Sequence, residues 1–217
     1  MTTRIYLIRH GGTAASTEDR FSGNTDIDLS DDGRRQAATL AKRLADDDIA
    51  AIYSSPMRRT IDTARIVGEP HHLTPIIRES LKEIHHGHWE TMLREDVERL
   101  YPEEYAAWVE DPFTFAPLGG KPGVMVMAEA LPTIREIVAN HPGQSVAVVS
   151  HKATIRLILC GLLGIDGRRY RTLLDQSPAS LNILDFKNPA RARLILFNDI
   201  SHYVNAISDI INPPDSI

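Results

Sequence analysis

The stretch RIYLIRHGG, residues 4–12, decides how the rest of the chain is interpreted. Ile5 to Ile8 form a continuous apolar run, which is typical of a short strand buried on both faces of a parallel sheet. The run stops at Arg9 and His10, and two glycines follow. The sequence therefore predicts a strand over residues 4–9 that delivers an arginine and an imidazole to its carboxyl end.

The rest of the chain alternates short apolar runs with segments of helical character. Further buried strands are expected at residues 49–53 and 145–150. Ser30 is placed to cap a helix, because apolar residues then recur at i, i+3, i+4 and i+7 spacing over residues 37–44. The other expected elements are helices at 57–67, 90–110 with a break near 101–102, 124–140 and 153–163, and strands at 181–186 and 194–197.

This alternation of strands and helices predicts an α/β fold. The expected architecture is a three-layer sandwich with a mainly parallel central sheet, helices on both faces and a small helical cap. No repeat or linker divides the chain, so residues 1–217 are expected to form a single domain, with about 90–123 as a possible cap insertion. Three prolines and three glycines within residues 111–123 predict a loop there. Residues 212–217 are expected to form a loose tail.

Composition narrows the classes of function. The net charge of −5 argues against a general nucleic-acid binder, which normally shows a basic excess. No apolar run approaches the length of a membrane span, and the first apolar stretch is too short for a signal peptide, so a cytoplasmic protein is expected. The one cysteine, Cys160, lies in an apolar run and is interpreted as a core residue. A disulfide within the chain and a paired-cysteine metal site are therefore excluded.

Two histidines occupy equivalent places in this pattern. His10 follows the first predicted strand, and His151 follows the strand at 145–150. Ligands of open α/β sheets bind outside the carboxyl ends of the strands, so the two imidazoles are expected to converge there. Arg9, Arg58 and Arg59 reach the same edge, and arginine binds phosphate oxygens in a bidentate manner. We expect one of the pair Arg58 and Arg59 to lie on a helix surface instead. The sequence thus predicts a phosphate site.

The motifs around these residues resemble those of the histidine phosphatase superfamily, the phosphoglycerate mutase-like proteins. LIRHG at 7–11 is similar to the family's Arg-His-Gly motif, and SSPMRR at 54–59 to its second phosphate-binding segment. LKEI at 81–84, with GHWE at 87–90, resembles the segment that carries the acid, and VVSH at 148–151 the segment of the second histidine. Residues 21–23 and 28–33 match the intervening loop and helix start. The matches keep the family's order from about residue 4 to 186.

This resemblance implies a mechanism and a set of site residues. His10 would attack phosphorus, with Arg9, Arg59 and His151 holding the phosphate oxygens. Glu83 would protonate the leaving group and then activate water. The implied partner is a small-molecule phosphate ester, with no cofactor and no metal. The spacing of His85, His86 and His88 does not suit a shared ligand geometry, and Trp89 is expected in the core. The implied substrate-binding residues are Arg9, Ser16, Ser22, Gly23, Arg59, Glu83, His151 and Lys152.

Departures from the family pattern leave the substrate open. The family commonly has Glu or Gln at the position of Gly12, Asn at Ser16 and Gly at Lys152, and residues 120–122 replace an expected Gly-Glu-Ser. Lys152 either contacts a second anionic group of the substrate or points to solvent from the first turn of a helix. Residues 87–90 resemble the phosphatase branch, but a mutase and a catalytically silent binding protein remain alternatives. A homodimer is also left open.

Overall fold

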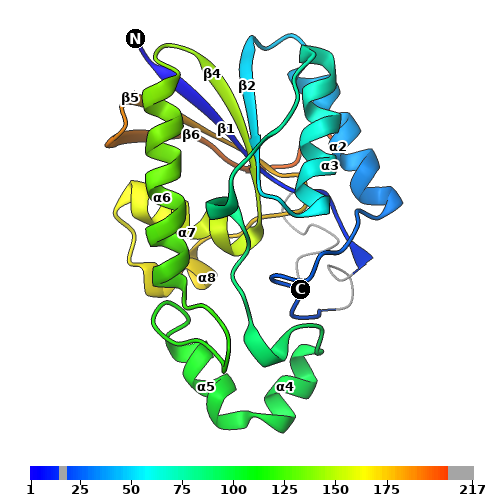
Figure 1. The fold of residues 1–217 in the computed structure, drawn as a ribbon, viewed down its shortest axis with the longest axis vertical. Helices are drawn as coiled ribbons and strands as arrows, with labels where there is room; N and C mark the ends of the chain where they lie inside the picture. Colours follow the sequence, from blue (N-terminus) through cyan, green and yellow to red (C-terminus); the bar gives the residue numbers. More distant parts are fainter. Residues whose placement is uncertain (15–18, 205–217) are drawn as a thin grey trace.

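A computed structural model describes residues 1–14 and 19–204 and shows one six-stranded sheet between two helical layers (Figure 1). The strand order is β3-β2-β4-β1-β5-β6. The strands are β1 (Thr3–Arg9), β2 (Ile49–Ser54), β3 (Ile76–Ile77), β4 (Ser145–Ser150), β5 (Leu181–Asn188) and β6 (Arg191–Asp199). The described helices are α2 (Asp31–Leu44), α3 (Arg58–Gly68), α4 (Arg94–Leu100), α5 (Pro102–Glu110), α6 (Gly123–Asn140), α7 (Lys152–Leu163) and α8 (Tyr170–Leu173).

β1 to β4 pair with one another in parallel, whereas β5 and β6 join the sheet through antiparallel pairs. β4 pairs in parallel with β1 on one side and with β2 on the other, and β3 extends the parallel part from β2. β5 runs antiparallel to β1, and β6 antiparallel to β5. The prediction of a mainly parallel sheet is confirmed, with an antiparallel hairpin at one edge. β6 is longer than the predicted strand at 194–197.

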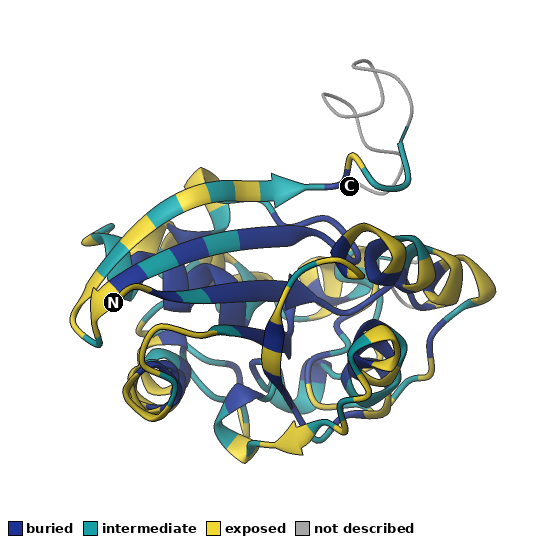
Figure 2. Cartoon of the chain, turned by 90° about the horizontal axis from the view of Figure 1, so that it is seen from above, coloured by how far each residue is buried: buried dark blue, intermediate teal, exposed yellow. Residues whose placement is uncertain are grey.

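Each face of the sheet carries its own apolar cluster, as the three-layer prediction requires. On one face, Ile134 and Ile137 of α6 and Ile155 and Ile158 of α7 pack against β1, β2, β4 and β5. On the other face, residues of α2 and α3 pack against the same strands. Figure 2 shows the central strands buried and the helices exposing only their outer surfaces. Cys160 in α7 is buried, as predicted.

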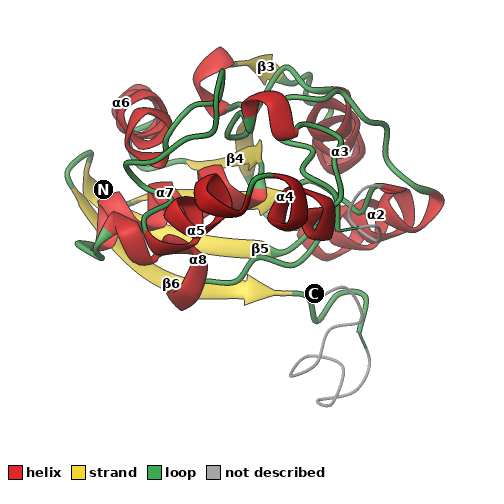
Figure 3. Cartoon of the chain, turned by 90° about the horizontal axis from the view of Figure 1, so that it is seen from below, coloured by secondary structure: helices red, strands yellow, loops and turns green. Residues whose placement is uncertain are grey.

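α4 and α5 lie beyond one end of the sheet, over the ends of the strands (Figures 1 and 3). Their apolar residues form a separate cluster with Phe21 and Trp89, and Trp89 is fully buried, as predicted. The break that was predicted near residues 101–102 separates the two helices. Among the described helices, none is both long and apolar enough to cross a membrane.

The predicted start of this helical segment at Glu90 is wrong, because α4 begins only at Arg94. Residues 90–93 pair instead with the loop at 19–25. The Glu90 carboxylate accepts hydrogen bonds from the backbone amides of Asn24 and Thr25, and the Thr91 amide donates to the Phe21 carbonyl. Thr91 has a positive φ of 71°. These long-range bonds hold the segment out of the helix that its composition favours.

The turn after β1 packs closely on the first turn of α2. A Cβ on Gly11 would lie 2.3 Å from the Gly33 carbonyl oxygen, and one on Gly33 would lie 2.1 Å from the Gly12 carbonyl oxygen. Ser30 caps α2, as predicted: its Oγ accepts from the Gly33 amide at 3.0 Å. The Ser30 amide also donates to the Gly12 carbonyl at 2.9 Å. Glycine at both positions thus lets α2 fix the backbone beside His10.

Gly33→Ala is expected to lower the free energy of unfolding by about 1–3 kcal/mol, the usual cost of overpacking. The added Cβ would collide with backbone, which cannot move aside cheaply. The matched control is Gly12→Ala, whose Cβ would meet no atom closer than Gln36 Oε1 at 3.4 Å, an ordinary contact distance. The measurement is urea unfolding of both variants, and equal destabilisation by the two would contradict this account.

Candidate active site

A cavity of about 590 Å³ opens at the carboxyl ends of β1 and β4. Most of the predicted site residues that the structure describes line it: Arg9, His10, Ser22, Gly23, Arg59, Glu83 and Lys152. Among the described lining residues, seven are Lys or Arg and only three are Asp or Glu. The cavity is therefore strongly cationic, which suits an anionic ligand. Ser16 lies outside the residues that the structure describes.

His10 is held as a neutral imidazole with one nitrogen committed to the backbone. Its Nδ1 lies 2.7 Å from the Gly11 carbonyl oxygen. A carbonyl can only accept, so Nδ1 carries the proton and Nε2 keeps its lone pair. Burial, and then the charges of Arg59 and Arg9, hold the pKa of His10 well below 6.5. His10 can therefore act as a nucleophile at neutral pH without first losing a proton.

His151 stands directly beside His10 but is fully buried. Because β1 and β4 pair with Arg9 opposite Ser150, the two imidazoles follow neighbouring strands, and their ring centroids are 5.2 Å apart. Nδ1 of His151 accepts from Arg59 Nε at 3.3 Å, so Nε2 carries the proton and donates to Ser55 Oγ at 2.8 Å. Both nitrogens thus contact protein groups, and a phosphate contact from His151 stays a prediction.

Arg59 is buried on α3 and is held by backbone carbonyls. Its two terminal nitrogens donate to the Gly23 and Thr25 carbonyls, each at 2.7 Å. Burial lowers the pKa of Arg59. Arg58, by contrast, is exposed and pairs with Asp26. The expectation that one arginine of this pair lies on the surface is confirmed.

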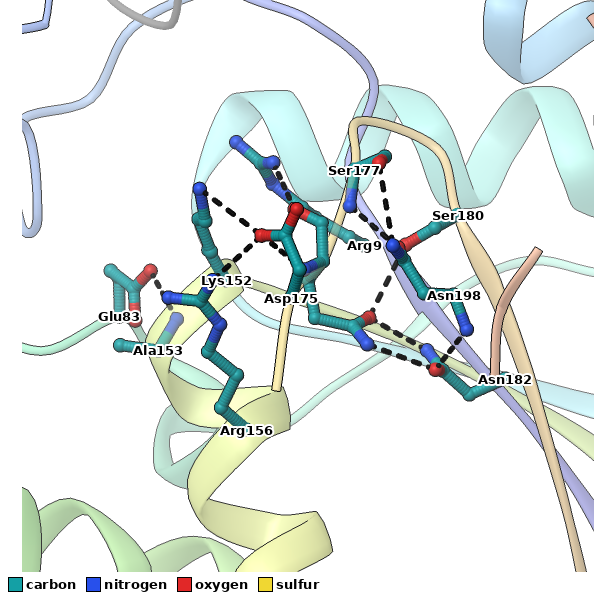
Figure 4. A network of polar contacts seen from close by, with 11 residues as sticks. Arg9, Glu83, Lys152, Ala153, Arg156, Asp175, Ser177, Ser180, Asn182 and Asn198 are labelled. Atoms are coloured by element: carbon teal, nitrogen blue, oxygen red, sulfur yellow. Dashed lines mark hydrogen bonds and ion pairs between the residues drawn. The ribbon is translucent and has the colours of Figure 1, made fainter. Parts of the chain in front are cut away.

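Arg9 is anchored from the other side of the cavity, in the polar network that Figure 4 shows in part. Its Nη1 donates to the Gln176 carbonyl at 2.6 Å, whereas its Nε is buried without a partner. Burial, and then the charge of Arg156, lowers the pKa of Arg9 to about 10, so it remains a cation at neutral pH. The Gln176 side chain is fixed in turn by Asn182, whose amide also donates to the Leu7 carbonyl of β1.

Glu83 lies at the N-terminus of α7, where it serves as the acceptor for the first helical turn. Its Oε2 accepts from the Ala153 amide at 3.1 Å, and its Oε1 accepts from the Thr154 amide at 3.1 Å and from Thr154 Oγ1 at 3.0 Å. The N-cap residue His151 makes no side-chain capping bond, so Glu83 takes that place. The carboxyl group is thereby fixed on the cavity wall.

Gly23 contributes through its backbone. A Cβ there would lie 1.8 Å from the Ile84 carbonyl oxygen, so only glycine lets this loop approach closely enough for its carbonyl to hold Arg59.

The three histidines at 85–88 have separate partners. His85 contacts the Gly119 carbonyl, His88 contacts the Leu118 carbonyl, and His86 packs against aromatic rings. Within residues 1–14 and 19–204, no group of three or more His, Cys, Asp or Glu side chains is placed to hold a metal ion.

Several residues that line the cavity were not predicted from the sequence. Arg156 lies four residues after Lys152 on α7, and that spacing places the two on one helix face, so it could have been noticed. Asp175 follows α8 and carries no sequence signal. The cap contributes Trp108, over which Arg171 stacks at 3.5 Å from the ring centroid and Arg94 at 5.6 Å.

Comparison with known proteins adds independent information. A family model described as the histidine phosphatase superfamily (branch 1) matches residues 5–200. Phosphoserine phosphatase 1 of Hydrogenobacter thermophilus is 37% identical over 163 residues, which cover 75% of this chain and 77% of the relative.

Two solved structures share the fold over nearly the whole chain. Native mycobacterial glucosyl-3-phosphoglycerate phosphatase superposes with a TM-score of 0.83 at 30% identity, covering 91% of this chain and 99% of that chain. Bacillus stearothermophilus YhfR superposes with a TM-score of 0.85 at 30% identity, covering 92% and 98% respectively.

The buried imidazoles predict a loss of stability in acid. The unfolded chain protonates His10 near pH 6.5 and the folded chain does not, so the unfolded state binds more protons as the pH falls below that value. Stability from this group is fully present above about pH 7 and declines below it. Between pH 7.5 and 5.5, wild type should lose about 1 kcal/mol more unfolding free energy than His10→Gln. Urea unfolding at the two pH values tests this, and an equal loss in the two proteins would refute it.

Proposed function

This chain belongs to the histidine phosphatase superfamily, and we propose that it hydrolyses a small phosphorylated metabolite through a phosphohistidine on His10, without a metal ion. Its relatives are named phosphatases, so it is a phosphoric monoester hydrolase. The observation that carries the proposal is the state of His10: a neutral imidazole whose free Nε2 lies in a cavity together with two buried arginines.

The reaction proceeds in two displacements. In the first, His10 Nε2 attacks phosphorus, the phosphorus–oxygen ester bond breaks, and the leaving oxygen takes a proton from Glu83. In the second, water attacks the phosphohistidine, Glu83 takes a proton from that water, and the phosphorus–nitrogen bond breaks to release inorganic phosphate. Covalent catalysis of this kind divides one difficult step into two easier ones.

Arg9 and Arg59 provide the charge that these steps require. Each is a buried cation on the cavity wall whose oxygen partners among the described residues are backbone carbonyls, so the positive charge remains available to the phosphate oxygens. Fixed donors of this kind stabilise developing negative charge without reorganising, and they are worth most where water is excluded. This electrostatic clamp supports chemistry without a metal ion. His151 holds Arg59 in place through Nδ1.

Glu83 is supported as the proton donor and acceptor by its place in the cavity. The amides of α7 hold both carboxylate oxygens, so the group stays aimed at the space beside His10. Glu83 becomes a carboxylate when the leaving oxygen takes its proton, and it returns to the carboxyl form when it takes a proton from the attacking water.

Phosphate release from a panel of metabolites tests the proposal. The panel includes phosphoserine, phosphoglycerates, sugar phosphates and an aryl phosphate, each assayed with and without a strong chelator. Activity is expected to survive chelation and to be inhibited by vanadate, which imitates five-coordinate phosphorus. Loss of activity on chelation, restored by a divalent ion, would contradict the metal-independent mechanism. Transfer of phosphate to a second hydroxyl in place of release would instead identify a mutase.

His10→Ala is expected to lower turnover by at least about 10³-fold, because no other described group replaces the nucleophile. Wild type quenched during turnover of a ³²P-labelled substrate should carry phosphate that is acid-labile and alkali-stable, and His10→Ala should carry none. Circular dichroism confirms that the variant is folded. Trapping of the label on another residue would refute His10 as the nucleophile.

Glu83→Gln is expected to slow the hydrolysis of a phosphate ester more strongly when its leaving group is more basic. An alkyl phosphate needs a proton on its departing oxygen, so it should lose about 10²–10⁴-fold in kcat, whereas a nitrophenyl phosphate should lose far less. The pair of substrates is its own control, since a merely structural defect would slow both alike. Equal losses for both leaving groups would remove Glu83 from the acid role.

A further inference from the structure

A second cationic cluster lies in the same cavity, beyond the residues that the phosphatase mechanism uses. Lys152 Nζ lies 3.6 Å from Asp175 Oδ1, and Arg156 Nη2 donates to the same oxygen at 2.7 Å. Figure 4 shows Asp175 between these two side chains. Arg156 is about nine-tenths buried, and its Nε has no partner among the described residues. All three side chains line the cavity that contains His10.

The charges of this cluster do not cancel. Two cations share one carboxylate, which leaves a net charge of about +1 next to the phosphate clamp. Burial, together with Arg9 and Arg156, lowers the pKa of Lys152 to about 8, so the ammonium is still mostly charged at pH 7. A lysine at the first position of a helix also opposes the helix dipole. A residual single charge in this position suits a monoanion such as a carboxylate.

The cluster is close to the phosphate clamp for a simple geometric reason. Lys152 directly follows His151, and Arg156 lies one turn further along α7 on the same face. Arg156 is near enough to Arg9 to lower its pKa. The two anion-binding regions therefore adjoin each other in one cavity. A single small substrate can therefore reach both regions.

We propose that Lys152 and Arg156, balanced by Asp175, form a specificity subsite for a carboxylate, so that the substrates are small phosphomonoesters that also carry a carboxylate. This inference rests on the proposed phosphatase function. It assigns Lys152 the contact with a second anion rather than a solvent-facing position, and it assigns Arg156 and Asp175 a role in substrate choice that is separate from the chemistry at His10.

The test compares substrates that differ only in the carboxylate. Phosphoserine is paired with phosphoethanolamine, and 3-phosphoglycerate with glycerol 3-phosphate, and the selectivity is the ratio of kcat/KM within each pair. Lys152→Gln is expected to lower this ratio about tenfold in both pairs, mainly through KM of the carboxylate member. Lys42→Gln removes a lysine from the exposed face of α2 and is the matched control, with an unchanged ratio.

Asp175→Asn gives a change of opposite sign. The amide oxygen still accepts a hydrogen bond, but the competing negative charge is removed, so the ratio should rise about threefold or more. A ratio that stays the same in Lys152→Gln, or falls in Asp175→Asn, would overturn the subsite. Failure of the phosphatase proposal looks different: neither member of a pair, nor an aryl phosphate, would be hydrolysed by wild type. Turnover that His10→Ala abolishes, with an unaltered ratio in Lys152→Gln, would reject only this inference.

Discussion

The parallel pairing of β1 with β4 is the constraint on which the rest of the site depends. Arg9 lies opposite Ser150, and the His10 amide donates to the Ser150 carbonyl at 3.0 Å, so the two strands end together. The residues that follow the two strands therefore lie side by side. His10 and His151 are neighbours, and the first turn of α7 comes directly after His151. A shift of register by one residue would reverse which face each side chain meets and separate the imidazoles.

Burying several arginine side chains beside one another costs free energy of desolvation. The groups that hold them decide whether their charge can still bind an anion. An arginine that is paired with a carboxylate is neutralised by it. Arg59 and Arg9 donate to backbone carbonyls, which orient the guanidinium groups without neutralising their charge. Burial, and then the charges of Arg59 and Arg9, hold the pKa of His10 low, so the two arginines also favour the neutral form of the imidazole beside them. Close packing of Gly23 on residue 84 is what brings the carbonyl within reach of Arg59.

α7 joins the parts of the site into one element. Its N-cap, His151, holds Arg59; the amides of its first turn hold Glu83; and its side toward the cavity carries Lys152 and Arg156. Apolar residues on the buried side of the same helix, Ile155 and Ile158 among them, pack into the core and fix its position. One rigid helix therefore positions the Glu83 carboxylate, the Arg59 guanidinium and the proposed carboxylate subsite.

The sequence by itself determined every described strand except β3, the order of the motifs and most of the predicted site residues that line the cavity, because each was encoded locally. The short apolar run before Arg9 and His10 indicates a buried strand without reference to the rest of the chain. The Ser30 cap likewise joins two residues only three positions apart. Only the tertiary structure decided that residues 90–93 pair with the loop at 19–25, that Glu83 caps α7, and that Asp175 lies between Lys152 and Arg156. These contacts join residues about 20 to 70 positions apart, and such pairings depend on how the whole chain packs rather than on any pattern along it.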